Sequence, residues 1–224
     1  MSFVHVRCGA AADAEFLAWV MLSASRAHLA RGLWDLIIGS DEAGCLDYLR
    51  RLAIAEPRSL YRCENFLIAE VAGERAAALC GFETRDAWSI VGEARANVQR
   101  DLGWTEAEAA ASYQRVSPIW TACMLPDIGA DFAIENVATL PEYRRRGLVN
   151  ALLDEALRNA SQRGYRLAQI MTYIGNEAAL SAYEKAGFKV FDEKLCTEVQ
   201  NILSVPGFVG LTRELRPTRE LKSP

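Results

Sequence analysis

The sequence predicts a mixed α/β fold, and three features of the chain carry that prediction. The 224 residues are 51% hydrophobic, which is enough to bury a core, and 24% charged, which is typical of a globular protein. In the N-terminal half, two apolar stretches separated by a short turn predict a β-hairpin. In the C-terminal half, strand-like and helix-like segments alternate, which is typical of α/β architectures.

The N-terminal half begins with a strand at 3–7, where residues of the two faces alternate. Apolar residues recur every three or four positions over 13–30 and 41–55, which predicts two helices with one apolar face each. The hairpin comprises strands at 66–71 and 77–82, joined by a turn that contains glycine.

A polar, helix-rich segment follows, and within it Thr105 and Glu108 have the spacing of a capping box. The later elements are strands at 132–140, 167–173, 188–191 and 208–215 and helices at 146–163, 176–186 and 197–203. The polar tail after Pro217 is expected to fray.

Composition excludes several classes of function. The net charge is −4, so the chain has no overall basic field for a nucleic acid or an anionic membrane. The longest apolar run, Phe16–Ala24, is too short to cross a bilayer, and the N-terminus has no secretion signal. The six cysteines lack the CxxC spacing of metal and redox sites, and the two histidines have no nearby metal-ligand partner. We therefore expect reduced thiols, no metal and a cytoplasmic location.

The junction around Gly147 has the features of an anion-binding helix start. Pro141 ends the preceding strand, and glycine lets the backbone approach a ligand closely. The first amides of a helix have no intrahelical partner and lie at the positive end of its dipole. The arginines at 144–146 add positive charge, so the junction predicts a phosphate site. A solvated basic loop is the alternative, and neither a P-loop nor a dinucleotide fingerprint is present.

Two short motifs follow one another in the C-terminal half. The first, of the form [RQ]xxGx[GA], is Arg144-Arg145-Arg146-Gly147-Leu148-Val149. The second, of the form N-x-x-A-x-x-x-Y-x-x-x-G-F, comprises Asn176, Ala179, Tyr183, Gly187 and Phe188. Together they resemble two motifs of the GNAT superfamily of N-acetyltransferases, in which the first binds acetyl-CoA. The matched motifs cover 134–191, and the first departs from the family pattern at Val149, where a branched side chain crowds the expected pyrophosphate site.

The resemblance implies a fold and a reaction. The implied fold is a central mixed, mostly antiparallel sheet, splayed between its fourth and fifth strands and flanked by helices. It forms a single domain over 1–224 with a helical insertion at about 85–129. The implied reaction transfers an acetyl group from acetyl-CoA, as co-substrate, to a primary amine of a small molecule or peptide. A homodimer is left open, and no nucleic acid, membrane or metal is expected.

The resemblance also assigns roles to individual residues. Tyr183 would donate a proton to the leaving thiolate, although an interior helix position is its alternative role. The Val137 amide would face the thioester carbonyl, and strand backbone beside it would pair with pantetheine. The expected cofactor-binding residues are Val137, Ala138, Thr139, Arg144, Arg145, Arg146, Gly147, Leu148, Val149 and Asn176.

Glu135 is the candidate general base. Many family members carry glutamate at the position of Ala133, and Glu135 lies two residues later, so we expect it on the same strand face as Ala133 and Val137. A solvated carboxylate at the strand edge is an equal alternative. Asp131 is a weaker candidate, and an enzyme that binds the neutral amine needs no base.

The acceptor is not named by any residue. Six residues of the insertion are candidates for an acceptor cavity: Asp86, Trp88, Glu93, Trp104, Trp120 and Asp127. The tryptophans have an alternative role in packing the insertion onto the core, and the insertion has one as a dimer interface. Two other functions remain open, transfer from another acyl-CoA such as succinyl- or propionyl-CoA, and a non-catalytic acyl-CoA sensor or interaction module.

Overall fold

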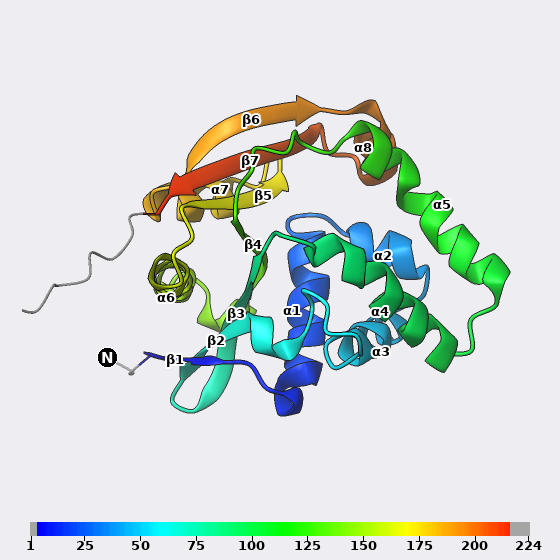
Figure 1. Cartoon of the computed structure of the whole chain (residues 1–224), viewed down its shortest axis with the longest axis horizontal. Helices are drawn as coiled ribbons and strands as arrows, with labels where there is room; N and C mark the ends of the chain where they lie inside the picture. The colour runs from blue at the N-terminus through cyan, green and yellow to red at the C-terminus, as the bar shows by residue number, and fades with distance from the viewer. Residues whose placement is uncertain (1–3, 216–224) are drawn as a thin grey trace, which may run out of the picture.

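The computed structural model describes residues 4–215, which form one seven-stranded sheet with helices on both faces (Figure 1). The strands are β1 (Val4–Cys8), β2 (Phe66–Val71), β3 (Glu74–Glu83), β4 (Phe132–Thr139), β5 (Leu167–Tyr173), β6 (Lys189–Leu195) and β7 (Gly207–Glu214). The helices are α1 (Ala14–Arg26), α2 (Leu33–Ile38), α3 (Glu42–Leu52), α4 (Ala87–Asp101), α5 (Glu106–Ala122), α6 (Leu148–Gln162), α7 (Glu177–Lys185) and α8 (Thr197–Leu203). Phe3 and the tail after Pro217 lie outside the described residues.

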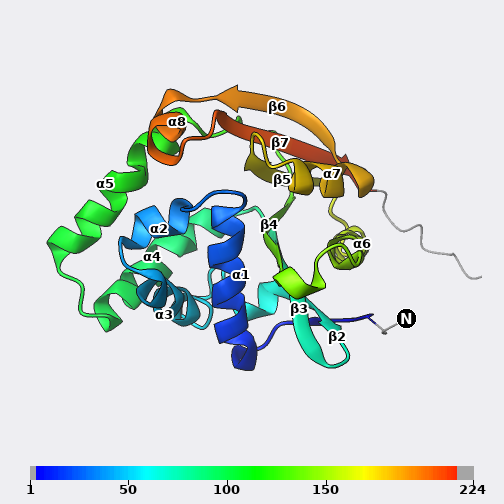
Figure 2. The same ribbon diagram turned by 180° about the vertical axis from the view of Figure 1, so that it is seen from behind.

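The strand order is β1-β2-β3-β4-β5-β7-β6, and every neighbouring pair is antiparallel except β4 and β5. The predicted mostly antiparallel α/β fold is confirmed. On one face of the sheet α1 packs against β3 and β4, with α2, α3 and α4 beyond it. On the other face α6 packs against β1 to β4 (Figure 2). The sheet thus separates two apolar cores.

The parallel pair β4–β5 holds together only at its start. Phe132–Ile134 pairs with Ala168–Ile170, and beyond these residues the two strands separate. β5 remains paired to β7 along its whole length, so the separation leaves the second half of β4 with a free edge toward β5. Free strand edges expose hydrogen-bonding groups of the backbone. The predicted splay between the fourth and fifth strands is therefore confirmed.

β4 also carries a bulge where it leaves β5. Glu135 pairs with Cys80 and Ala138 with Ala78, so Asn136 and Val137 together face one residue of β3. Asn136 has a φ of 52°, which lies in the left-handed region. An inserted residue resets the alternation of side chains along a strand.

The bulge corrects one expectation about β4. Glu135 lies, like Ala133, on the face covered by α1, because its partner Cys80 belongs to that core. Val137 packs instead against the core on the α6 face, so placing it on the same face as Glu135 was wrong. Strand periodicity alone does not reveal a bulge.

The predicted helix at 13–30 ends at Arg26, and the separate short helix α2 follows. Ala27 has a φ of 53°, which ends the helix. Arg26 then pairs with Asp35 of α2 at 2.8 Å. From α5, Arg115 donates to the carbonyls of Leu36 and Ile37 at the end of α2. A six-residue helix held by such tertiary contacts has too few turns to show a clear period.

The predicted insertion holds α4 and α5, and the capping box of Thr105 and Glu108 is confirmed at the start of α5. At the other end of α5, Cys123 forms a disulfide with Cys196 beside α8, with Cα atoms 5.4 Å apart. The expectation that all six cysteines are reduced was therefore wrong. The two partners are 73 residues apart in sequence, so no local spacing indicates that they pair. No helix within 4–215 combines the length and the apolar character that a membrane span needs.

Candidate active site

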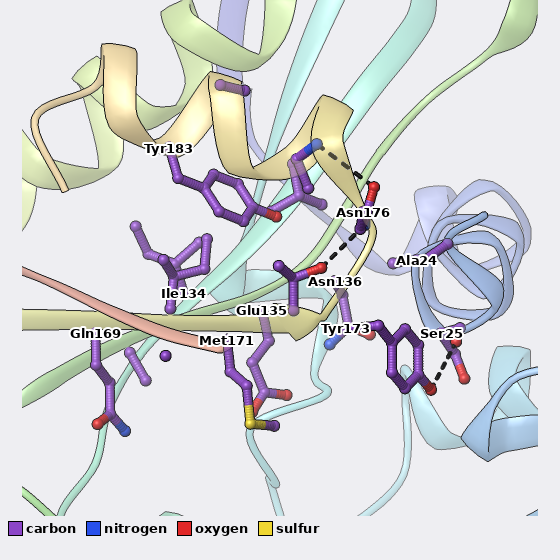
Figure 3. A pocket seen from close by; sticks show the side chains of 18 of the residues that line it. Ala24, Ser25, Ile134, Glu135, Asn136, Gln169, Met171, Tyr173, Asn176 and Tyr183 are labelled. Carbon is purple, nitrogen blue, oxygen red and sulfur yellow. Dashed lines mark hydrogen bonds between the residues drawn. The ribbon is translucent and has the colours of Figure 1, made fainter. Parts of the chain in front are cut away.

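A cavity of about 1460 Å³ occupies the gap where β4 and β5 separate. It extends from the start of α6 and from α7 on one face of the sheet to the end of α1 and to α2 on the other. Figure 3 shows this gap from close by, with side chains of β4, β5 and α7 pointing into it. A hydrogen bond of 3.1 Å from the Tyr173 hydroxyl to the Ser25 carbonyl ties β5 to the end of α1.

The loop before α6 has the geometry of an anion site. Arg145 and Gly147 have φ values of 62° and 79°, and Gly147 is the N-cap of α6. The first hydrogen bond of the helix runs from the Ala151 amide to the Gly147 carbonyl, so the amides before it have no partner in the helix. A Cβ atom at Gly147 would have no atom within 4 Å, which leaves the space above these amides open. The helix begins two residues later than predicted because Gly147 is left-handed.

The three arginines of the loop are not equivalent. Arg144 lines the cavity and donates through Nε to the Thr139 carbonyl at 3.3 Å. Arg145 also lines the cavity, with an exposed side chain. The Arg146 guanidinium instead donates to the Glu142 carbonyl and lies over the Tyr143 ring. Arg146 is therefore expected to contribute through its backbone alone.

The free part of β4 presents backbone and polar side chains to the cavity. All residues of 133–139 line it. Within the described chain, two buried side-chain atoms have no hydrogen-bond partner, Nδ2 of Asn136 and Oγ1 of Thr139. Buried polar atoms are normally paired, so two unpaired ones beside one cavity point to a polar ligand there. Sequence reasoning selected Thr139 for its backbone and missed Asn136.

Glu135 lies on the α1 face of the gap, beside Met171 (Figure 3). Burial raises the pKa of its carboxyl to about 7. No described residue donates a hydrogen bond to this carboxylate in the structure, and the side chain lines the cavity. A carboxyl with a pKa near neutrality and free lone pairs suits proton transfer. Asp131 does not, because its oxygens accept from the amides of Arg166 and Leu167.

Tyr183 lies on the opposite face, in α7, and its ring points into the gap (Figure 3). The side chain is buried, and burial raises the pKa of the phenol well above its ordinary value. The phenol therefore stays protonated at neutral pH. Its ring packs against Phe188, so the catalytic role and the packing role weighed for this residue are compatible.

Asn176 caps α7. Its Oδ1 accepts from the Ala179 amide at 3.5 Å, and its Nδ2 donates to Thr172 Oγ1 at 2.9 Å. One of the two Nδ2 hydrogens remains after these bonds. Its contact with the CoA arm stays a prediction.

The amino-acid sequence matches a known family model. The model of the acetyltransferase (GNAT) family matches residues 60–188, more than half of the chain. The chain belongs to the GNAT acetyltransferase family. A comparison with curated protein sequences finds no match.

Solved structures show the same fold for this GNAT protein. A crystal structure described as an acetyltransferase has a TM-score of 0.67 at 18% identity, covering 95% of this chain and 100% of its own. An N-acetyltransferase from Staphylococcus aureus Mu50 has the same TM-score and identity, covering 93% and 100%. The ribosomal-protein-S18-alanine N-acetyltransferase from Escherichia coli has a TM-score of 0.52 at 15% identity, covering 99% of both chains.

The predicted acceptor residues of the insertion divide into those that line the cavity of this GNAT acetyltransferase and those that do not. Of the six insertion residues selected from sequence, Trp88, Trp120 and Asp127 line the cavity. Trp104 does not, because it packs on Tyr48 in the core at a ring distance of 5.7 Å. Asp86 and Glu93, at and within α4, are likewise not part of its wall.

Several wall residues were missed by sequence reasoning. The most consequential are Trp34, Tyr61 and Met171. Trp34 and Tyr61 lie between predicted elements, at 31–40 and 56–65, and Met171 lies in the apolar strand predicted at 167–173. Only the tertiary fold brings them to the cavity, so no local pattern identifies them.

Proposed function

We propose that this GNAT protein is an acetyl-CoA-dependent N-acetyltransferase that transfers the acetyl group directly from the thioester to a primary amine. Family membership supports acetyl transfer, and one observation supports the rest. A single cavity joins the open helix start of α6, the free edge of β4 and two titratable side chains, Glu135 and Tyr183. These are the groups that thioester aminolysis needs.

The donor would lie on the α6 side of the gap. The backbone amides of 145–149 would bind the pyrophosphate, assisted by the positive end of the helix dipole. The absence of atoms within 4 Å of a Cβ position at Gly147 supports this placement. The free edge of β4 at 137–139 would pair with pantetheine as an added strand does. Val149 is partly buried against the α6 core, which reduces the part of its side chain that faces the diphosphate.

The reaction needs two proton transfers. The amine nitrogen attacks the acetyl carbonyl carbon, forming the C–N bond, and Glu135 accepts the proton that the nitrogen loses. The backbone amide of Val137 would stabilise the tetrahedral oxyanion. The C–S bond then breaks, its electron pair stays on sulfur, and Tyr183 supplies the proton that makes the free thiol. The products are the N-acetylated amine and CoA.

Calorimetry with acetyl-CoA, followed by an assay of free thiol in the presence of amines, tests the proposal. We expect saturable binding and amine-dependent release of thiol. Binding without thiol release from any amine would indicate an acyl-CoA sensor instead. Succinyl- and propionyl-CoA as donors test acyl preference in the same assay. Absence of any CoA binding by the folded protein would refute the proposal.

A further inference from the structure

The α1 side of the cavity has mostly apolar walls. Six of the wall residues are Trp34, Tyr61, Trp88, Trp120, Leu125 and Met171. The Trp34 and Tyr61 rings meet edge to face at 5.1 Å, and Trp88 packs edge to face on Phe82 at 6.2 Å. Such walls gain free energy from the apolar surface of a ligand.

Gly210 of β7 allows the side chains of this apolar wall to pack closely. It pairs with Met171 of β5, and a Cβ atom at Gly210 would collide with the side chains of Phe191 and Leu125. Glycine therefore makes room for two apolar side chains beside Met171. The wall is built for packing on the side where the acceptor would enter.

The carboxylates of the cavity are distributed unevenly. Four of the described wall residues are acids, and three of them accept hydrogen bonds from the protein. Glu83 accepts from the Tyr165 hydroxyl, Asp127 from the backbone amide two residues later, and Asp131 from the amides at the start of β5. Only the Glu135 carboxylate has no protein donor in the described chain. A neutral donor leaves a carboxylate charged, but Glu83 and Asp127 are exposed to solvent and Asp131 is held at the start of β5. Glu135 is therefore the free counter-ion among the apolar walls.

We infer that the acceptor is a primary monoamine whose carbon body is aromatic or bulky aliphatic, and not a polyamine or a guanidino amine. This inference rests on the proposed function. The Glu135 carboxylate matches one ammonium group, which releases one proton to solvent before its neutral nitrogen attacks. The proton that the nitrogen loses on forming the C–N bond then goes to Glu135. A second cation on the same ligand would lie against aromatic walls without a counter-ion, which is costly when water is excluded.

Two matched pairs of amines test the inference in the thiol-release assay. Butylamine and putrescine have the same carbon chain and differ in the second amine. Phenethylamine and ethylamine differ in the aromatic ring. We expect kcat/KM to be about 10²-fold higher for butylamine than for putrescine and about 10²-fold higher for phenethylamine than for ethylamine, as expected for an unpaired charge and for a filled apolar pocket.

Calorimetry with acetyl-CoA distinguishes failure of the inferred acceptor class from failure of the proposed function. If acetyl-CoA binds and putrescine or agmatine is acetylated faster than both monoamines, the inference is overturned while the proposed function stands. If acetyl-CoA does not bind, the proposed function fails and the inference with it. Binding of phenethylamine to the complex with CoA, measured without turnover, gives a second readout of the apolar wall.

Substitutions of Trp88 test the role of the apolar wall in acceptor binding. This residue is 52% exposed, so we expect its replacement to leave the fold intact. Trp88→Ala is expected to raise KM for phenethylamine about 10-fold without changing the affinity for acetyl-CoA, because it removes part of the wall. Trp88→Glu adds a second carboxylate and is expected to shift preference toward putrescine. Tyr113→Ala, at a 64% exposed position of α5 outside the cavity, is the control. Equal effects of Trp88→Ala and Tyr113→Ala would refute the inference.

Discussion

Glu135 and Tyr183 lie on opposite faces of the sheet, on either side of the gap between β4 and β5 (Figure 3). Glu135 faces the core under α1, and Tyr183 belongs to the core under α6 and α7. A thioester placed in the gap would therefore have a proton acceptor on the side of the incoming amine and a proton donor on the side of the departing sulfur. The separation of the two strands creates this arrangement.

Replacing Glu135 by glutamine is expected to lower kcat/KM about 10²-fold, the usual contribution of a general base. In the wild type, the rate should rise with pH as Glu135 loses its proton, through a pKa of about 7. The variant should lose this step in the pH profile. Glu93→Gln on the exposed surface of α4 is the matched control. A step near pH 7 that persists in Glu135→Gln would assign the pKa to another group.

Glu135→Gln is also expected to stabilise the protein at alkaline pH. Burial raises the pKa of this carboxyl from 4.5 to about 7, so the folded state binds a proton more tightly than the unfolded state does. The stability that the protonated carboxyl contributes is complete below pH 4.5 and is lost as pH rises through 7. At pH 9 the variant should gain about 2 kcal/mol, since one pKa unit corresponds to about 1.4 kcal/mol and the carboxyl keeps some solvent contact.

Urea denaturation of the two proteins at pH 4 and pH 9 measures this difference. The curves should differ at pH 9 and approach each other at pH 4. A gain of the same size at both pH values would show that the glutamine acts by packing and not by removing a buried charge.

Replacing Tyr183 by phenylalanine is expected to lower kcat about 10²-fold, since a general acid contributes on that order. Acetyl-CoA should bind the variant as it binds the wild type, because the ring and its contact with Phe188 are kept. Steady-state kinetics and calorimetry separate the two quantities. Tyr113→Phe, at an exposed position, is the control. Unchanged kcat in Tyr183→Phe would leave this tyrosine with a packing role only.

Apart from the short helix α2, the order of strands and helices was predictable because the elements carry their own period or cap. The open helix start at Gly147 was predictable for the same reason, since glycine, arginines and helix start are adjacent in sequence. That it binds a phosphate stays a prediction. The position of Val137 was not, because the bulge at Asn136 depends on the pairing of β4 with β3. The disulfide of Cys123 and the wall residue Trp34 likewise result from contacts between distant segments.

Replacing Gly147 by alanine tests the phosphate site directly. Gly147 and Gly164, at the two ends of α6, have φ values of 79° and 86°, and a Cβ atom would meet nothing within 4 Å at either position. Alanine should therefore cost about 1 kcal/mol of folding stability at both positions, through backbone strain alone. Only Gly147→Ala places a methyl group over the free amides of the helix start, so it alone should weaken acetyl-CoA binding, by about 10-fold or more. Calorimetry on both variants decides the matter, since equal affinities would place the diphosphate elsewhere.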